Sequence, residues 1–335
     1  MIGNLFTSLV VASALMSGVM LSANAQDSFG SGGNAFTMDF VEIGNPGNPD
    51  DSGTTGLYHS SYGNVANTFR MGTYEVSEDM INKANALGGL GITHNSRGAD
   101  KPASSISWNE AARFVNWLNV SNGHSAAYKF ADQPGDGGYS ANTNIELWQS
   151  GDAGYDASNL YRNANAMYFL PSEDEWYKAA YYGGSGTTYS DYTTGGDSAP
   201  DGIDSSGDSD FDAVIDDGYN QGGPNDITNA GDAASFYGTF GQGGNIWEWH
   251  ESAGNGYNGV FGPTSENRAY RGGNWLSSEF SLRSSTRYDY APTSENSAIG
   301  FRVASIPEPS AVLMLILGAL GLMYRRRFAR CLLDR

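Results

Sequence analysis

The pattern of apolar and polar residues predicts three amphipathic helices, each opened by a serine that can cap it. Ser107 with Glu110, and Ser172 with Glu175, form capping boxes, in which each side chain accepts a hydrogen bond from the other residue's backbone N–H. The helices are expected to begin after Ser77, Ser107 and Ser172; the first should run to about Leu87 and end at Gly88-Gly89, and the third should end at Gly183-Gly184. Their apolar faces are expected to pack into a core.

Shorter segments have the alternation of β-strands and are separated by stretches rich in Gly, Pro, Asp and Ser. Strands are expected at Phe36–Ile43 and at Phe69–Tyr74, with short ones near Arg268–Trp275 and Ile299–Ala304. Residues 26–35 are rich in Gly and Ser and are interpreted as a flexible lead-in. The pattern alone therefore predicts an α+β domain with much irregular structure.

The first 25 residues have the features of a signal peptide. An apolar run from Leu5 to Leu21 is followed by Ala23-Asn24-Ala25, the small-x-small pattern that signal peptidase cuts. The α-amino group is the only positive charge before the run. The alternative is a buried N-terminal helix.

The C-terminus, residues 306–335, resembles the PEP-CTERM sorting signal of Gram-negative bacteria that make exopolysaccharide. Pro307, Glu308 and Pro309 precede an apolar stretch from Ala311 to Tyr324, which is followed by Arg325, Arg326 and Arg327. Fourteen helical residues span roughly 21 Å, so flanking side chains must snorkel or the bilayer must thin. The arginines should stay cytoplasmic, which places the domain outside the cytoplasm. The resemblance implies an inner-membrane anchor that an exosortase removes; the alternative is a terminal core helix.

The part between these two ends is strongly acidic. Five of the 18 Lys and Arg residues lie after residue 324, so residues 26–306 carry 13 of them against 35 Asp and Glu, a net charge near −22. This charge disfavours nucleic acid and anionic membrane surfaces as partners. It suits either a calcium-exposed extracellular protein or simple solubility. The only cysteine, Cys331, lies in the tail, so residues 26–306 hold no disulfide.

Four blocks of sequence resemble the formylglycine-generating enzymes, the sulfatase-modifying factor family. They are Phe169–Ala180, Gly243–Trp249 (GGNIWEW), Arg271–Trp275 (RGGNW) and Ile299–Val303 (IGFRV), in the family's order and spacing. The resemblance implies that residues 36–305 adopt that family's loop-rich variant of the C-type lectin fold.

The family's chemistry needs two cysteines that this chain does not have. The resemblance places them at Glu279 and Ser284, and the family's copper ion requires soft thiolate ligands, which neither a carboxylate nor a hydroxyl supplies. No copper and no catalytic residue are therefore expected. The alternative is an enzyme of altered, oxidoreductase-like chemistry that uses Glu279.

Structural calcium is a further implication of the resemblance. The family binds it through the GNxWEW block, which corresponds here to the carbonyls of Gly244 and Ile246 and to the Glu248 carboxylate, a mixture of oxygens that calcium prefers. A further side-chain ligand of the family falls at Gly241, which has no oxygen to offer, and Asn220 is the candidate for a second site. The alternative is that Glu248 only accepts hydrogen bonds within the loop.

The segment between Trp275 and Ile299 is the candidate ligand face, as in lectin-like folds. Its predicted binding residues are Asn274, Trp275, Arg283, Arg287, Tyr288 and Tyr290, among several serines. Aromatic and arginine anchors between small polar residues suit adaptable recognition. The alternative is that the tyrosines are only partly buried loop residues.

These inferences favour an exported module, associated with the cell surface or the matrix, that binds a glycan such as exopolysaccharide or a surface protein. Signal peptidase and an exosortase would process it. The alternatives are the enzyme of altered chemistry and a structural matrix component without a discrete ligand.

Overall fold

The computed structural model describes residues 25–52, 61–202, 212–216, 222–231, 234–254 and 263–307. Its helices are α1 (Glu78–Gly88), α2 (Trp108–Ser121) and α3 (Glu173–Tyr181), with 3-10 turns η1 (Gly32–Asn34), η2 (Ile227–Asn229) and η3 (Glu279–Leu282). Its strands are β1 (Ala25–Phe29), β2 (Phe36–Ile43), β3 (Phe69–Gly72), β4 (Tyr168–Phe169), β5 (Asp201–Gly202), β6 (Asp212–Ala213), β7 (Trp247–Ala253), β8 (Arg268–Arg271), β9 (Tyr288–Tyr290), β10 (Ile299–Gly300) and β11 (Ala304–Ser305).

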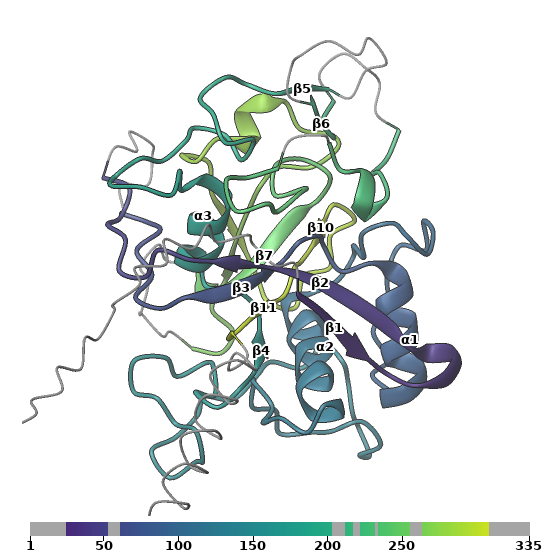
Figure 1. The fold of residues 1–335 in the computed structure, drawn as a ribbon. Coiled ribbons are helices and arrows are strands. Elements are labelled where there is room, and N and C mark those ends of the chain that lie inside the picture. Colours follow the sequence, from purple (N-terminus) through teal and green to yellow (C-terminus); the bar gives the residue numbers. More distant parts are fainter. Residues whose placement is uncertain are drawn as a thin grey trace, which may run out of the picture.

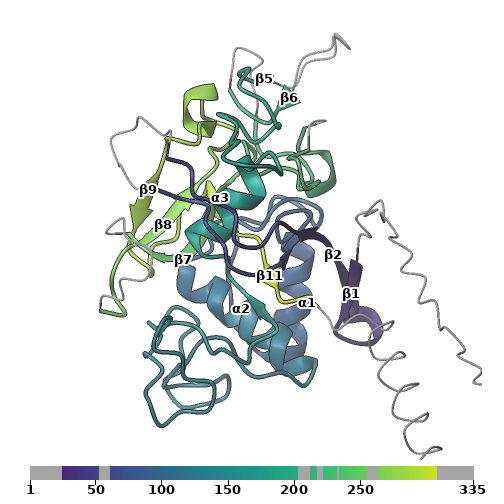
Figure 2. The same ribbon diagram turned by 60° about the vertical axis from the view of Figure 1, so that its left-hand side comes forward.

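The strands form two main sheets and one short pair. The first sheet has the order β1-β2-β3-β11-β4 and is antiparallel throughout. The second has the order β10-β7-β8-β9, and β5 pairs with β6. Helices α1 and α2 lie beside the β1–β2 hairpin, whereas β5 and β6 lie at the opposite end of the molecule from α2 (Figures 1 and 2).

The predicted helix caps are confirmed. Both members of each capping box bond as expected, at Ser107 with Glu110 and at Ser172 with Glu175, and Ser77 accepts a hydrogen bond from the Met80 N–H. Gly89 ends α1 in the left-handed conformation, with φ of 61°. Three short local signals thus set where the helices begin because each one satisfies backbone groups that a helix end leaves free.

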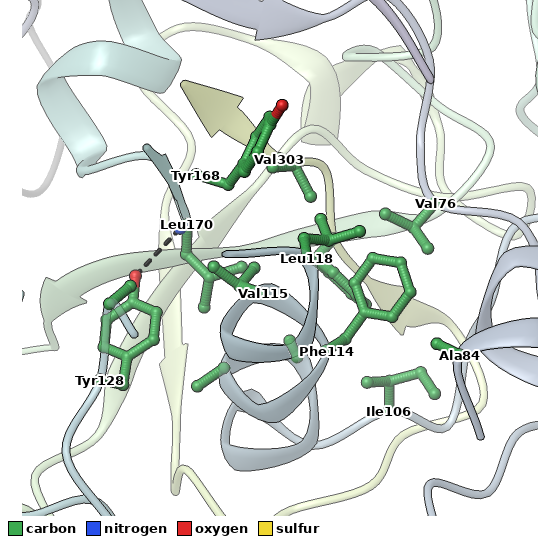
Figure 3. Close-up of a cluster of buried hydrophobic side chains, with 14 of the residues drawn as sticks. Val76, Ala84, Ile106, Phe114, Val115, Leu118, Tyr128, Tyr168, Leu170 and Val303 are labelled. Carbon is green, nitrogen blue, oxygen red and sulfur yellow. Dashed lines mark hydrogen bonds between the residues drawn. The ribbon is translucent and has the colours of Figure 1, made fainter. Parts of the chain in front are cut away.

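The main hydrophobic core lies where α2 meets the first sheet. Phe114, Val115 and Leu118 point from one face of α2 toward Val76 and Val303 (Figure 3). The core therefore joins the helix α2 to residues just before the final strand, which are remote from it in the sequence.

The interpretation of residues 26–35 as a flexible lead-in is wrong. Residues 25–29 form β1, which pairs with β2 from Ala25↔Phe40 to Phe29↔Phe36. The Phe29 ring is buried against Phe36, and Asp27 forms an ion pair of 2.7 Å with Arg70 and accepts a hydrogen bond of 2.8 Å from the Tyr168 hydroxyl. The tertiary partners of Phe29 and Asp27 outweigh the Gly- and Ser-rich composition that follows them.

The predicted strand near residues 299–304 is divided between the two sheets. Ile299 and Gly300 pair with β7, whereas Ala304 and Ser305 pair with β3 and β4. The intervening Phe301, Arg302 and Val303 are buried, so this stretch joins the sheets through the middle of the domain.

The two ends of the chain lie largely outside the described residues. The proposed signal peptide falls there except for Ala25, and so does the sorting signal after Pro307. Within the described ranges, no helix has the length and apolarity needed to cross a membrane.

If β1 is an integral strand, Asp27→Ala should lower the free energy of unfolding by about 2–3 kcal/mol, because Arg70 then stays buried without its carboxylate. Urea denaturation of the purified protein measures the change. Gln26→Ala, an exposed position on the same strand, is the control and should change stability by less than about 0.5 kcal/mol. If both substitutions change the free energy of unfolding equally and by little, β1 does not stabilise the domain and the segment is a lead-in.

Candidate functional site

The GGNIWEW block makes a tight turn into β7 that only small residues permit. Gly244 has φ of +87°, and a Cβ there would lie 2.7 Å from the Val214 carbonyl oxygen. The next residue, Asn245, is also left-handed, and its amide donates to both carboxylate oxygens of Glu75, at 3.0 and 2.9 Å. After this turn the chain enters β7, where the Glu248 side chain is fully buried.

Glu248 forms a fully buried ion pair with Arg302. Its Oε1 lies 2.6 Å from Nη2 of Arg302, and its Oε2 lies 2.7 Å from Nε of Arg302 and 2.6 Å from Nε1 of Trp176. Arg302 also donates to the carbonyls of Gly72, at 2.9 Å, and Phe240, at 2.8 Å. The bidentate pair and these carbonyl contacts satisfy the guanidinium in a site without solvent access.

Glu75 is a second buried carboxylate beside this pair, and the sequence interpretation missed it. Burial, together with the charge of Glu248, raises its pKa well above the ordinary value, although Arg302 opposes the shift. A Cβ added at Gly241 would lie 3.2 Å from the Glu75 carboxylate. Glu75 thus lies beside the position where the resemblance places a family calcium ligand, and the missing side chain at Gly241 leaves it room.

These contacts do not fit a calcium site at Glu248. The Glu248 charge is already matched by Arg302, and Gly241 offers no side-chain oxygen. Asn220, the candidate for a second calcium site, lies outside the described residues. No group of three or more His, Cys, Asp or Glu side chains in the described ranges could hold a metal ion.

Arg287 is a structural residue, so its prediction as a ligand contact is corrected. It is buried and bonds both oxygens of Glu173, at 2.9 and 3.0 Å, as well as the Gly254 carbonyl at 2.9 Å. Arg271 bonds the same carboxylate at 2.7 Å. Burial opposes ionisation of Glu173, but Arg271 and Arg287 outweigh it and hold its pKa below the ordinary value.

The two positions that correspond to the family's cysteines have different surroundings. Glu279 begins η3 at the half-exposed surface, whereas Ser284 is buried. The Ser284 N–H donates to the Asp191 carbonyl at 2.9 Å, and its own carbonyl accepts from Arg271 at 2.8 Å. The backbone of Ser284 is therefore anchored, but neither side chain can supply a thiolate.

Asn274 and Trp275 are likewise buried rather than presented to a ligand. The side-chain Oδ1 of Asn274 accepts hydrogen bonds from the Leu276 N–H at 2.8 Å and from the Ser277 hydroxyl at 3.0 Å. This side chain therefore stabilises its own turn. The guanidinium of Arg97 covers the Trp275 ring at 4.4 Å. The sequence could not show this burial because Arg97 is remote along the chain.

Arg283 lies at the half-exposed surface beside η3. Its Nε donates to the Tyr192 hydroxyl at 2.9 Å, and its guanidinium lies 5.3 Å from the centre of the Phe280 ring. Arg283 therefore remains available at the surface, although it is partly held by its neighbours.

Tyr288 and Tyr290 are exposed and belong to a surface that we call the aromatic shelf, made of Trp247, Tyr270, Tyr288 and Tyr290. Tyr288 is 47% exposed and Tyr290 46%. Tyr270 stacks on Tyr288 with ring centres 5.9 Å apart, and Trp247 meets these two rings edge-on at 5.4 and 5.3 Å. The shelf follows from strand pairing, since Tyr270 lies directly opposite Tyr288 and β9 is the edge strand (Figure 2).

Comparison with known proteins agrees with this architecture. Residues 55–306 match the family model described as the sulfatase-modifying factor enzyme 1-like domain. The structure is similar to Treponema denticola variable protein 1, at 20% identity and a TM-score of 0.55, over 84% of this chain and 99% of that one. It is also similar to CarF, at 19% identity and a TM-score of 0.54, over 81% of this chain and 99% of that one. No curated protein sequence matches the chain.

At these identities the two structural similarities concern the fold alone. The predicted fold class is confirmed, because the loop-rich mixture of short helices and curled sheets has neighbours of the formylglycine-generating-enzyme and C-type-lectin-like folds.

Glu248→Gln should destabilise the protein by about 3 kcal/mol, because the buried Arg302 loses its bidentate carboxylate partner. Urea denaturation measures this loss. Asp79→Asn is the matched control, because it removes a carboxylate from the surface pair with Lys83 and should cost less than about 1 kcal/mol. A Glu248→Gln protein as stable as the control would show that the pair does not hold the domain together.

Millimolar calcium and EDTA should leave Tm unchanged, because Arg302 already neutralises Glu248. Thermal unfolding with each additive tests this expectation. A rise of Tm with calcium in the wild type that is lost in Glu248→Gln would instead establish the calcium site.

Proposed function

This chain belongs to the sulfatase-modifying factor enzyme 1-like domain family, and from that premise we propose that it is an exported glycan-binding module. It keeps the family scaffold without the thiolates of formylglycine formation, because residues 26–306 contain no cysteine. A binding role uses the scaffold without requiring the lost metal.

The aromatic shelf is the observation that carries this proposal. The apolar C–H face of a sugar ring packs on aromatic faces, while hydroxyl groups bond the polar rim around them. Tyr288 and Tyr290 are exposed on the edge strand, and the rings of Trp247 and Tyr270 pack against Tyr288. Partial burial, together with the neighbouring Tyr288, raises the pKa of Tyr270 to about 12, so this hydroxyl stays neutral and can act as a donor.

The charge of the domain narrows the glycan class. Residues 26–306 carry 13 Lys and Arg against 35 Asp and Glu, so an acidic polysaccharide would be repelled over much of the surface. We therefore assign the shelf to neutral segments of a polysaccharide such as a co-produced exopolysaccharide. This preference distinguishes the proposal from general adhesion.

Export and anchoring complete the proposal. The apolar run from Leu5 to Leu21 and the Ala23-Asn24-Ala25 pattern support secretion with cleavage by signal peptidase. The Pro307-Glu308-Pro309 motif and Arg325–Arg327 support temporary anchoring in the inner membrane, followed by exosortase cleavage and release to the cell surface or matrix. The polysaccharide would then be met outside the cell.

The double substitution Tyr288→Ala with Tyr290→Ala should weaken binding to neutral polysaccharide by at least about ten-fold, because both exposed aromatic faces are removed. A glycan array identifies a bound polysaccharide, and affinity measurements on it compare the proteins. Phe236→Ala is the control, since Phe236 is an exposed aromatic residue outside the shelf and its loss should leave affinity unchanged. Wild-type protein that binds no glycan, or binding that survives the double substitution, would refute a glycan-binding role for the shelf.

A further inference from the structure

A polar cavity of about 430 Å³ lies apart from the aromatic shelf and from the positions of the lost cysteines. Its walls come from the loop 156–166, the beginning of α3, the end of β7 and the segment before β3, and Ile306 lies at its edge. No residue of the shelf lines it, and neither does Glu279 or Ser284. The volume falls in the roughly 300–1,000 Å³ range of small-molecule sites.

The cavity includes a wall of polar side chains that are held in place. Glu251 is 2% exposed, and its two oxygens accept hydrogen bonds from the Tyr128 hydroxyl at 2.8 Å and from the Asn159 amide at 2.6 Å. The side-chain Oδ1 of Asn159 in turn accepts hydrogen bonds from the backbone N–H groups of Tyr161 and Arg162, at 3.1 and 3.2 Å. This wall is therefore pre-organised before any ligand enters.

Arg162 is the one cationic side chain of the lining, and its ion-pair contacts are long. Its contacts with Glu175 run from 3.3 to 3.5 Å, and its Nε lies 3.4 Å from Glu251. The buried ion pairs of Arg271 and Arg302 are much shorter, at 2.7 and 2.6 Å. Contacts of 3.3–3.5 Å are weak hydrogen bonds, so these N–H groups can exchange them for shorter bonds to a ligand.

The apolar side of Arg162 is also positioned. Its guanidinium packs over the Phe169 ring at 3.9 Å, and this contact fixes the plane of the guanidinium. Its N–H groups can then form hydrogen bonds only within that plane. Phe169 itself lines the cavity, together with Val65 and Ala164. Apolar surface therefore lies next to the polar groups, as a ligand with both kinds of face requires.

The charge of the lining restricts the ligand. Four carboxylates, those of Asp156, Asp174, Glu175 and Glu251, face one guanidinium in the lining, so an acidic ligand would meet an excess of negative charge. A purely apolar ligand would leave these groups desolvated. A molecule with many hydroxyl groups and no acid group satisfies both restrictions, because each hydroxyl can donate to a carboxylate or accept from Arg162.

We propose that this cavity is a second binding site, which takes a short non-acidic saccharide, neutral or bearing an amine. Arg162 donates to its hydroxyl oxygens, Glu175 and Glu251 accept from its hydroxyl or ammonium groups, and Val65 and Ala164 offer apolar surface to its ring. The inference shares its ligand chemistry with the proposed function but rests on different residues, so either can fail without the other.

Titration calorimetry on the purified protein tests the proposal with four probes: cellobiose, the disaccharides of N-acetylglucosamine and of glucosamine, and digalacturonate. At least one of the first three should bind, and digalacturonate should not. Ala164→Trp should weaken that binding by about ten-fold or more, because an exposed residue of the lining then fills the cavity without removing a polar contact. Ala157→Trp places the same side chain on the same loop outside the lining and should leave binding unchanged.

Arg162→Gln should also weaken binding by about ten-fold, through the loss of a charged donor. If Arg162→Gln unfolds, the comparison of Ala164→Trp with Ala157→Trp still tests the cavity site. The cavity assignment is overturned if no non-acidic probe binds, if digalacturonate binds, or if both Trp variants bind equally. The Tyr288→Ala, Tyr290→Ala protein should bind the disaccharide normally; loss of binding there would move the disaccharide to the shelf and overturn the cavity site.

Discussion

The ion pair between Glu248 and Arg302 is the interaction on which the rest of this structure depends. Glu248 lies on β7 of the second sheet, and Arg302 lies between β10 and β11, where the chain passes from the second sheet to the first. Trp176 of α3 bonds the same carboxylate. A buried pair of this kind adds little net stability compared with apolar packing. Removal of one partner is nevertheless strongly destabilising, because the charge of the other partner then remains in the interior. It therefore specifies how the two sheets and α3 meet.

Glu173 is another buried carboxylate with a similar structural role, and it lies near the candidate ligand face. Glu173 holds Arg271 and Arg287, and these arginines bond the carbonyls of Ser284 and Gly254. Loops without regular hydrogen bonding are thereby anchored through their backbone oxygens. Because this anchoring does not use the side chains at positions 279 and 284, the scaffold does not depend on the cysteines of its family.

The two proposed binding sites would hold their ligands through different interactions on the same scaffold. The aromatic shelf offers open apolar faces at a sheet edge, which suits one side of an extended polymer. The cavity beside Arg162 and Glu251 is concave and offers hydrogen-bonding groups, which suits a short saccharide or the end of a chain. The acidic surface repels acidic sugars from both. A module built this way could hold a polymer along its length and by a terminus, which would increase its effective affinity.

The sequence alone determined the features that depend on neighbouring residues. Ser107 with Glu110 and Ser172 with Glu175 begin helices because a cap needs only side chains three positions apart. The GGNIWEW and IGFRV blocks indicated the family, and residues 26–306 have no cysteine to supply the soft thiolates that suit copper.

Only the tertiary structure decided the features that depend on remote partners. Asp27 and Phe29 make a strand of a Gly- and Ser-flanked segment because Arg70 and Phe36 pair with them. Arg287 and Trp275 are withdrawn from the ligand face by Glu173 and Arg97, which no local pattern connects to them. The sequence could place arginine and tyrosine in one segment, but burial separated Arg287 from Tyr288 and Tyr290, because a charge that finds a buried counterion stays inside while an edge-strand ring stays outside.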